Sequence, residues 1–267
     1  MSDAGTYFAA DAELLDEERR LQLLAELFDP ASISRLARIG ISPGWRCLEV
    51  GAGGGSIARW MADRVGSAGS VLATDLDTRL LSSLGARHIE VRTHDITNDG
   101  LEQGGYDLAH ARSVLTHVSD PEAAARNMVR ALRPGGWLLL EEPDTDTTMP
   151  VHPTHACAEV YTRLQNVASD FVRRSRILDP AFGRKVPGII QRLGLVETGN
   201  EVSGAIVMGA TLRAGFWKTT ASRLRTAMVA SGATTEADWD AYYAAHEDPT
   251  FQYFEMSFIA GWGRKPL

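Results

Sequence analysis

Apolar and polar positions change their spacing along the chain. Over residues 11–28, leucines recur at helical intervals among charged residues, which predicts an amphipathic helix. Pro30 predicts a break, followed by a second helix over residues 31–39. From Trp45 onward, short apolar runs alternate with longer segments of helical periodicity. The chain therefore begins with a helical extension and continues as an α/β domain.

The apolar runs predict strands at residues 46–50, 70–74, 88–92, 106–110 and 137–141, with a turn at 133–136. Helices are predicted between them at 56–65, 78–84 and 121–132. Such alternation is typical of a parallel sheet that is covered by helices on both faces. Ligands of these sheets bind at the carboxyl ends of the strands, so we expect functional residues there.

The last third of the chain is less regular. It predicts helices at 155–171, 181–193, 211–230 and 235–246, and strands at 195–207 and 251–259. We therefore expect a helical extension or lid over residues 1–40 and one domain over 41–267. Substrate-side insertions are expected at about 143–188 and 209–247.

Composition narrows the classes of protein. The chain has 267 residues and a formal net charge of −7, which argues against a general nucleic-acid binder. Two cysteines, Cys47 and Cys157, cannot form a disulfide framework or a cysteine-based zinc site. No apolar run has membrane-spanning length, and the N-terminal segment lacks the basic start of a secretory signal. A cytoplasmic protein is expected, and a homodimer is left open.

A glycine cluster follows the first predicted strand, in the sequence EVGAGGGS over residues 49–56. Glycine permits a tight turn and lets a ligand lie against the backbone. The next helix offers unpaired N–H groups at its start. Asp75 ends the second strand, where a carboxylate can accept hydrogen bonds from both hydroxyls of a ribose. Alternatively, Asp75 caps the helix that follows.

Two ligands fit this unit, a dinucleotide such as NAD(P) and S-adenosylmethionine. The dinucleotide fingerprint expects a third small position where Ser56 stands, and it has no acid at the position of Glu49. An acidic glycine loop suits a sulfonium and an ammonium better than a pyrophosphate. The residues therefore favour S-adenosylmethionine and leave an NAD(P)-dependent oxidoreductase open.

Several segments, in order, resemble the motifs of the class I S-adenosylmethionine-dependent methyltransferases. Residues 49–55 resemble the first motif and Asp75 the ribose-binding acid. Residues 94–96 resemble the adenine-binding segment, and 106–112, 132–140 and 258–263 the fourth, fifth and last strands. The resemblance covers mainly residues 45–142. It implies a Rossmann-like, seven-stranded mixed sheet with helices on both faces and an antiparallel last strand.

The resemblance also implies a set of cofactor-binding residues. These are Glu49, Gly51, Ala52, Gly53, Asp75, Leu76, Asp95, Ile96, Ala111 and Arg112. For Arg112 a surface ion pair is an equal alternative. Tyr7, Phe8 and Trp217 are candidates for contact with the substrate.

Methyl transfer from a sulfonium depends mostly on alignment, and a weak nucleophile also needs a general base. Candidate bases near the carboxyl edge are His117, His152 and His155. No third ligand accompanies the last two histidines, so no metal is expected. The acidic residues Glu142 and Asp144, with Asp146 after them, are expected to be solvated, to hold a cationic substrate or to contribute an acid–base group.

The sequence predicts a methyltransferase that acts on a small molecule at O, N or C, in specialised metabolism. An adenosylmethionine-binding protein that catalyses a cyclisation without methyl transfer would carry the same cofactor motifs. Methylation and cyclisation therefore stay open alternatives.

Overall fold

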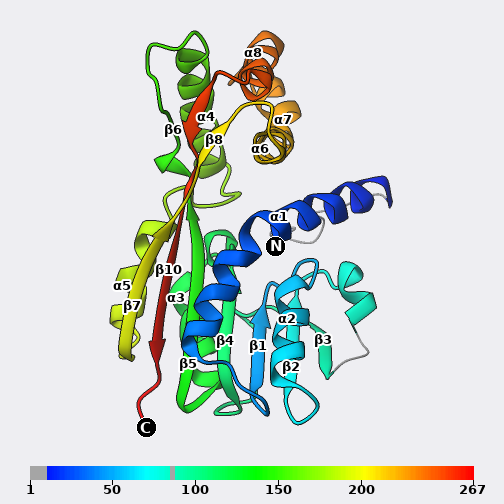
Figure 1. Ribbon diagram of the computed structural model, residues 1–267, viewed down its shortest axis with the longest axis vertical. Coiled ribbons are helices and arrows are strands. Elements are labelled where there is room, and N and C mark those ends of the chain that lie inside the picture. Colours follow the sequence, from blue (N-terminus) through cyan, green and yellow to red (C-terminus); the bar gives the residue numbers. More distant parts are fainter. Residues whose placement is uncertain (1–10, 85–87) are drawn as a thin grey trace.

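The computed structural model describes residues 11–84 and 88–267, and its base is a seven-stranded mixed sheet (Figure 1). In spatial order the strands are β3 (Ile89–Thr93), β2 (Ser70–Asp75), β1 (Arg46–Val50), β4 (Tyr106–Arg112), β5 (Leu132–Asp144), β10 (Ser257–Arg264) and β7 (Val196–Ser203). The first five are parallel, and β10 runs antiparallel to both neighbours. The predicted sheet and its antiparallel last strand are confirmed.

Helices cover both faces of this sheet. On one face, α1 (Asp11–Ile39) and α2 (Ser56–Val65) pack on a core that includes Cys47 and Leu108. On the other, α3 (Pro121–Ala131) and α5 (Val186–Arg192) pack on Leu48 and Leu138. Neighbouring residues of β1 thus point to opposite faces, and both faces are apolar because both are covered.

A smaller layer, here called the cap, lies beyond the carboxyl edge of the sheet (Figure 1). It consists of a second sheet, β6 (Met149–Pro150), β9 (Gln252–Phe254) and β8 (Ile206–Met208), and four helices, α4 (Ala158–Arg174), α6 (Leu212–Ser222), α7 (Arg225–Ala230) and α8 (Glu236–Glu247). The order β6-β9-β8 repeats the order β5-β10-β7. The three strands of the cap sheet are therefore extensions of β5, β10 and β7 beyond the carboxyl edge of the main sheet.

The continuation includes a bulge. Ser203 pairs with Phe258, and Ile206 pairs with Phe254, so two residues separate these pairs on one strand and three on the other. The extra residue lies between Phe254 and Phe258, in the segment that contains the buried Glu255. The bulge thus changes which side chains point into the cap.

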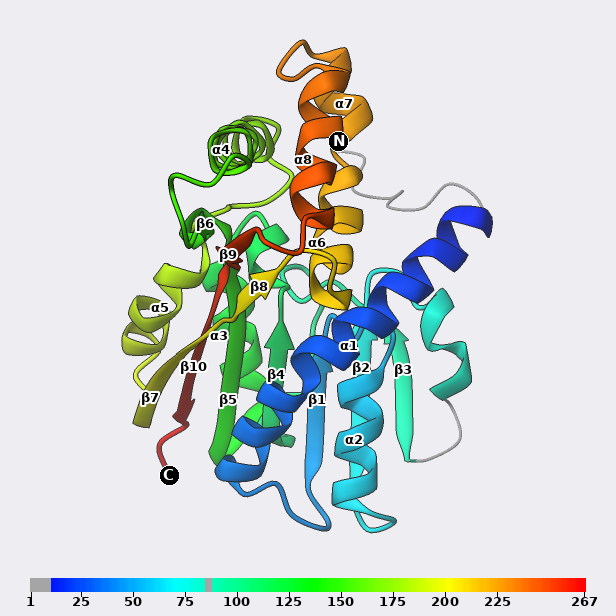
Figure 2. The ribbon, with the colours of Figure 1, turned by 45° about the horizontal axis from the view of Figure 1, so that its top comes forward.

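Helix α1 continues through Pro30, so the predicted break is wrong. Proline removes one helical hydrogen bond, but packing on both sides of it outweighs this loss. After Pro30, Leu36 is buried against α2. Before it, Phe28 packs on Phe216 of α6 and Phe258 of β10. Figure 2 shows the result, a helix that crosses the carboxyl edge of the sheet toward the cap.

Other boundaries differ where irregular turns interrupt a periodic pattern. Predicted residues 78–84 form a 3-10 helix (Arg79–Leu84), and the 181–193 helix shortens to α5 after a 3-10 turn. The predicted segments 195–207, 211–230 and 251–259 each divide into two elements, and residues 133–136 belong to β5. Within the described parts of the chain, no helix is both long enough and apolar enough to cross a membrane.

Candidate cofactor site

The glycine cluster forms a turn that only glycine accommodates. Gly51, Gly53 and Gly55 have φ angles of 67°, 54° and 75°, in the left-handed region. A Cβ on Gly51 would lie 2.2 Å from Cγ2 of Val114, so the turn also has no room for a side chain there. The backbone at this point is close to the loop that follows β4.

Asp75 is bound to the same turn from the end of β2. Its Oδ2 accepts a hydrogen bond from the backbone N–H of Gly53 at 2.8 Å, and its Oδ1 accepts one from Asp77 at 3.2 Å. Burial raises the pKa of the Asp75 carboxyl, and these N–H groups act in the opposite direction. The capping role belongs to Asp77, which accepts a hydrogen bond from the backbone of Arg79.

An apolar side chain lies next to this carboxylate in an exposed position. Leu76, directly after β2, is 62% exposed. Asp95, after β3, closes its own turn by accepting hydrogen bonds from Thr97 and Asn98, and Ile96 is buried beside it. A carboxylate, bare backbone and an exposed leucine thus lie together at the carboxyl edge of the sheet.

Helix α1 covers the turn. Cδ2 of Leu21 lies 3.5 Å from the position that a Cβ on Gly53 would take, and Cβ of Leu21 lies 3.4 Å from the corresponding position on Gly54. At the end of β4, Ala111 is buried and Arg112 points to α1. Arg112 donates to Asp29 at 2.8 Å and to Ser32 at 3.0 Å, so it forms an ion pair that is largely buried rather than the surface pair considered for it.

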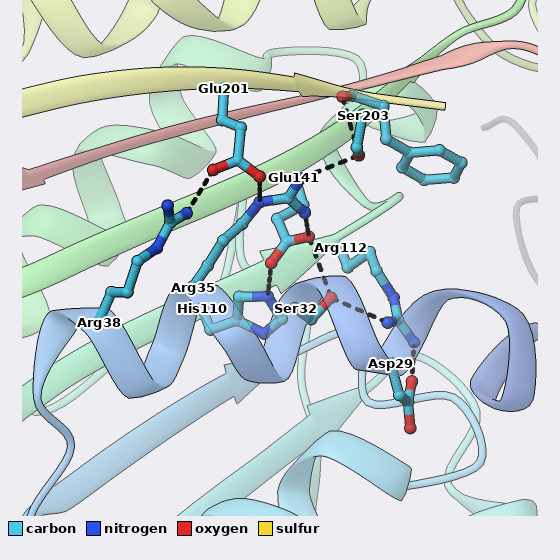
Figure 3. Close-up of polar contacts among 10 residues, drawn as sticks. Asp29, Ser32, Arg35, Arg38, His110, Arg112, Glu141, Glu201 and Ser203 are labelled. Atoms are coloured by element: carbon cyan, nitrogen blue, oxygen red, sulfur yellow. Dashed lines mark hydrogen bonds and ion pairs between the residues drawn. The ribbon is translucent and has the colours of Figure 1, made fainter. Parts of the chain in front are cut away.

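Glu49 lies beneath the turn rather than on its open side. Its carboxylate is 2.6 Å from Nδ1 of His110, a fully buried residue of β4 that sequence reasoning missed. Nε2 of His110 lies 3.3 Å from Glu141, which contacts Arg35 of α1 (Figure 3). Glu49, His110 and Glu141 each follow, two residues later, an apolar residue of the core on the same face of their strand. Which of these polar side chains become neighbours depends on the order of the strands in the sheet.

Glu142 and Asp144 are buried, so the prediction of a solvated acidic run is wrong for them. Glu142 accepts hydrogen bonds from the backbone N–H groups of residues 114–116. Burial raises the pKa of Glu142 to about 7 against these donors. Asp144 binds Arg184 through two hydrogen bonds, and Asp146 pairs with Arg173. Glu142 thus holds the loop that carries Val114 and His117.

His117 lies in the loop after β4, close enough to α1 for the charge of Arg20 to act on it. The side chain is in contact with solvent. Its pKa is nevertheless lowered, because the surrounding protein atoms desolvate the charged form of the ring and because Arg20 carries a positive charge. Its Nδ1 lies 3.3 Å from the backbone oxygen of Ile177. A neutral ring that donates through Nδ1 leaves Nε2 free to accept a proton.

The other two predicted bases lie in the cap. His152 is exposed in the loop before α4. Nδ1 of His155 accepts from the backbone of Cys157, and its Nε2 lies 3.1 Å from Thr250. Side-chain donor atoms of His155, Cys157 and Asp248 approach within 4.8 Å of one another, but both ring nitrogens already have hydrogen-bond partners. These histidines are not brought to the glycine turn by any contact of the described residues.

Of the predicted substrate residues, Trp217 is on α6, packs against Phe28 of α1 and donates from Nε1 to Glu255 at 2.9 Å. Tyr7 and Phe8 fall outside the described residues.

The chain is similar to known proteins over this region. Residues 13–179 match the protein family described as "Methyltransferase domain". An uncharacterised 37.1 kDa protein in a Streptomyces fradiae transposon is 34% identical over 140 residues, or 51% of this chain and 40% of that protein. A ubiquinone biosynthesis O-methyltransferase of Xanthomonas campestris is 36% identical over 111 residues, or 39% of this chain and 45% of that protein. The matches thus span less than half of these relatives.

Among solved structures, a phosphoethanolamine N-methyltransferase of Haemonchus contortus in complex with S-adenosyl-L-methionine has a TM-score of 0.52 at 18% identity. The match covers 89% of this chain and 53% of that one, and it shows a shared fold. The family match extends over more than half of the chain and includes the glycine turn and Asp75. The chain therefore belongs to the class I S-adenosylmethionine-dependent methyltransferases.

Proposed function

We propose that this protein transfers a methyl group from S-adenosylmethionine to a small-molecule acceptor at O, N or C, in specialised metabolism. One observation carries the proposal. The carboxylate of Asp75 is already bound to the bare backbone of the glycine turn, at the sheet edge where ligands of this fold bind.

The proposed cofactor site follows from this edge. Gly51, Ala52 and Gly53 face the amino-acid part of the cofactor, and Asp75 accepts hydrogen bonds from the ribose. Leu76 and the turn at Asp95 and Ile96 enclose the adenine, with Ala111 and Arg112 at the end of β4. Glu49 does not face the cofactor in this arrangement. It lies beneath the glycine turn and holds the end of β1 in place through its contact with His110. The exposed position of Leu76 supports this arrangement, because an adenine ring would remove that side chain from water.

When bound, adenosylmethionine supplies an electrophilic methyl on a good leaving group. The work left to the protein is to align an acceptor with that methyl and to exclude water. Leu21 of α1 and Val114 close over the glycine turn, which supports such a role for the N-terminal segment 1–40 as a lid.

His117 is the candidate general base that the geometry favours over His152 and His155. Its pKa is lowered, which favours the neutral ring near pH 7, and its hydrogen bond to the backbone of Ile177 uses Nδ1 rather than Nε2. For a hydroxyl acceptor, Nε2 of His117 would take the proton of that hydroxyl during methyl transfer. The backbone bonds to Glu142 hold the loop that presents this ring.

The acceptor would lie between α1 and the cap, against segments of the two insertions at about 143–188 and 209–247. Trp217 belongs to an aromatic cluster with Phe28 and Phe258 on this side of the molecule. Apolar and aromatic lining is typical of sites for small organic molecules. A small apolar or aromatic acceptor is therefore proposed.

Calorimetry with adenosylmethionine, NADH and NADPH tests the cofactor. Binding of adenosylmethionine alone is expected, and binding of a nicotinamide cofactor alone would overturn the proposal. Turnover with a panel of phenols, amines and enolisable ketones then tests the reaction. Release of S-adenosylhomocysteine in proportion to product is expected, whereas product without it would indicate a cyclisation or another non-methylating reaction.

A further inference from the structure

A series of buried charged groups runs from Glu49, beneath the glycine turn, to helix α1. Figure 3 shows the part of it from His110 to α1. His110 is at its centre and has no exposure to solvent. Nδ1 of His110 lies 2.6 Å from Oε2 of Glu49 on β1, and Nε2 lies 3.3 Å from Oε1 of Glu141 on β5. The imidazole therefore bridges two carboxylates from the strands on either side of its own.

Glu141 carries the chain on to α1. Its Oε2 accepts hydrogen bonds from Arg35 at 2.7 Å and from Ser32 at 3.0 Å. Arg35 continues to Glu201 and Ser203 on β7. The α1 helix is thus anchored to the sheet through the same carboxylate that contacts His110.

With both carboxylates ionised, the ring donates on both sides. A neutral imidazole has one N–H, so one of the two buried carboxylates would face a bare nitrogen. Burial lowers the pKa of His110, but the charges and hydrogen bonds of Glu49 and Glu141 outweigh it and raise the pKa to about 9. Arg112 on the same strand and Arg35 on α1 are the other charged groups nearby, and both act on the carboxylates.

Both ends of this series of charged groups, Glu49 and helix α1, lie next to the proposed cofactor site. Glu49 is two residues before Gly51, and its backbone oxygen accepts a hydrogen bond from Thr74, next to Asp75. Leu21 of α1 lies over Gly53. We infer that His110 is a positioning residue which couples the glycine turn to α1, so that adenosylmethionine binding and docking of α1 favour one another. The inference rests on the proposed function, and the coupling must be reciprocal.

Two substitutions of His110 each keep one of its two contacts and remove the other. In His110→Asn the amide nitrogen takes the place of Nδ1 and reaches Glu49 only. In His110→Gln it takes the place of Nε2 and reaches Glu141 only. Calorimetry measures adenosylmethionine affinity, and hydrogen exchange measures the protection of α1 amides 29–39 with and without cofactor. Both variants are expected to bind at least fivefold more weakly than the wild type.

Hydrogen exchange separates coupling from a purely structural role. In the wild type, saturating cofactor is expected to slow exchange in both the glycine turn and α1. In His110→Asn it should still slow exchange in the turn but no longer in α1. Equal slowing of α1 in variant and wild type would overturn the coupling. Failure of the wild type to bind adenosylmethionine would instead overturn the proposed function.

A milder variant covers the case in which His110 variants do not fold. Ser32→Ala removes one hydroxyl that bonds Glu141 and Arg112. It should reduce the cofactor-induced slowing in α1 at least twofold, and unchanged slowing would contradict the inference. Ser34→Ala, the same substitution at an exposed position of the same helix, is the matched control and should behave as the wild type.

Discussion

The carboxylate of Asp75 accepts a hydrogen bond from the backbone N–H of Gly53 at 2.8 Å. This contact joins the end of β2 to the turn after β1, so the acid and the glycines are prearranged before a ligand arrives. Four predictions test what this edge of the sheet and its surroundings do.

Removal of the Asp75 carboxylate should weaken cofactor binding. Asp75→Ala is expected to raise the Kd for adenosylmethionine at least tenfold, because the ribose hydroxyls lose a charged acceptor. Asp77→Ala is the control, since Asp77 pairs with Arg79 at the surface. Equal affinities of the Asp75 variant and the wild type in calorimetry would rule out the ribose role.

Gly51 should not tolerate a side chain. In Gly51→Ala, the left-handed φ alone costs on the order of 1 kcal/mol, and the new methyl also meets Val114. We expect a lower midpoint of thermal unfolding and weaker binding of adenosylmethionine. Adding Val114→Ala should relieve the clash and restore part of the midpoint, but not the part due to φ. If the double variant unfolds at the same temperature as Gly51→Ala alone, the clash with Val114 does not cause the destabilisation.

His117 should affect turnover more than cofactor affinity. His117→Asn is expected to lower kcat about 100-fold, within the usual range for a general base, with little change in the Kd for adenosylmethionine. His152→Ala, in the exposed loop of the cap, should leave kcat unchanged. A normal rate in His117→Asn would leave alignment of the acceptor as the mechanism.

Glu142 should make stability depend on pH. Its pKa is raised from 4.5 to about 7 in the folded protein, so the folded state binds this proton more tightly than the unfolded state. The resulting stabilisation is complete below pH 4.5 and is lost as the pH rises through 7. Relative to Glu142→Gln, the free energy of unfolding of the wild type should fall by up to ~3 kcal/mol across this range. Denaturant titrations of both proteins at pH 5 and pH 8 check this, and parallel pH profiles would contradict it.

Features that depend on neighbouring residues could be predicted from the sequence. Each strand of the parallel part is a short apolar run, and the glycine turn lies directly between a strand and a helix. Asp75 could be placed because the carboxyl ends of parallel strands share one edge. These inferences need only local periodicity and the known handedness of strand–helix–strand units.

Only the tertiary structure showed that α1 continues through Pro30, since the contacts that stabilise it come from α2, α6 and β10. The same is true of His110, whose partners Glu49 and Glu141 become neighbours through the order of β1, β4 and β5. Arg35 meets Glu141 across a separation of 106 residues. The spacing of hydrophobic residues predicts which side of a strand is buried. It does not predict which distant polar group lies opposite a given residue, because the packing of the elements decides that pairing.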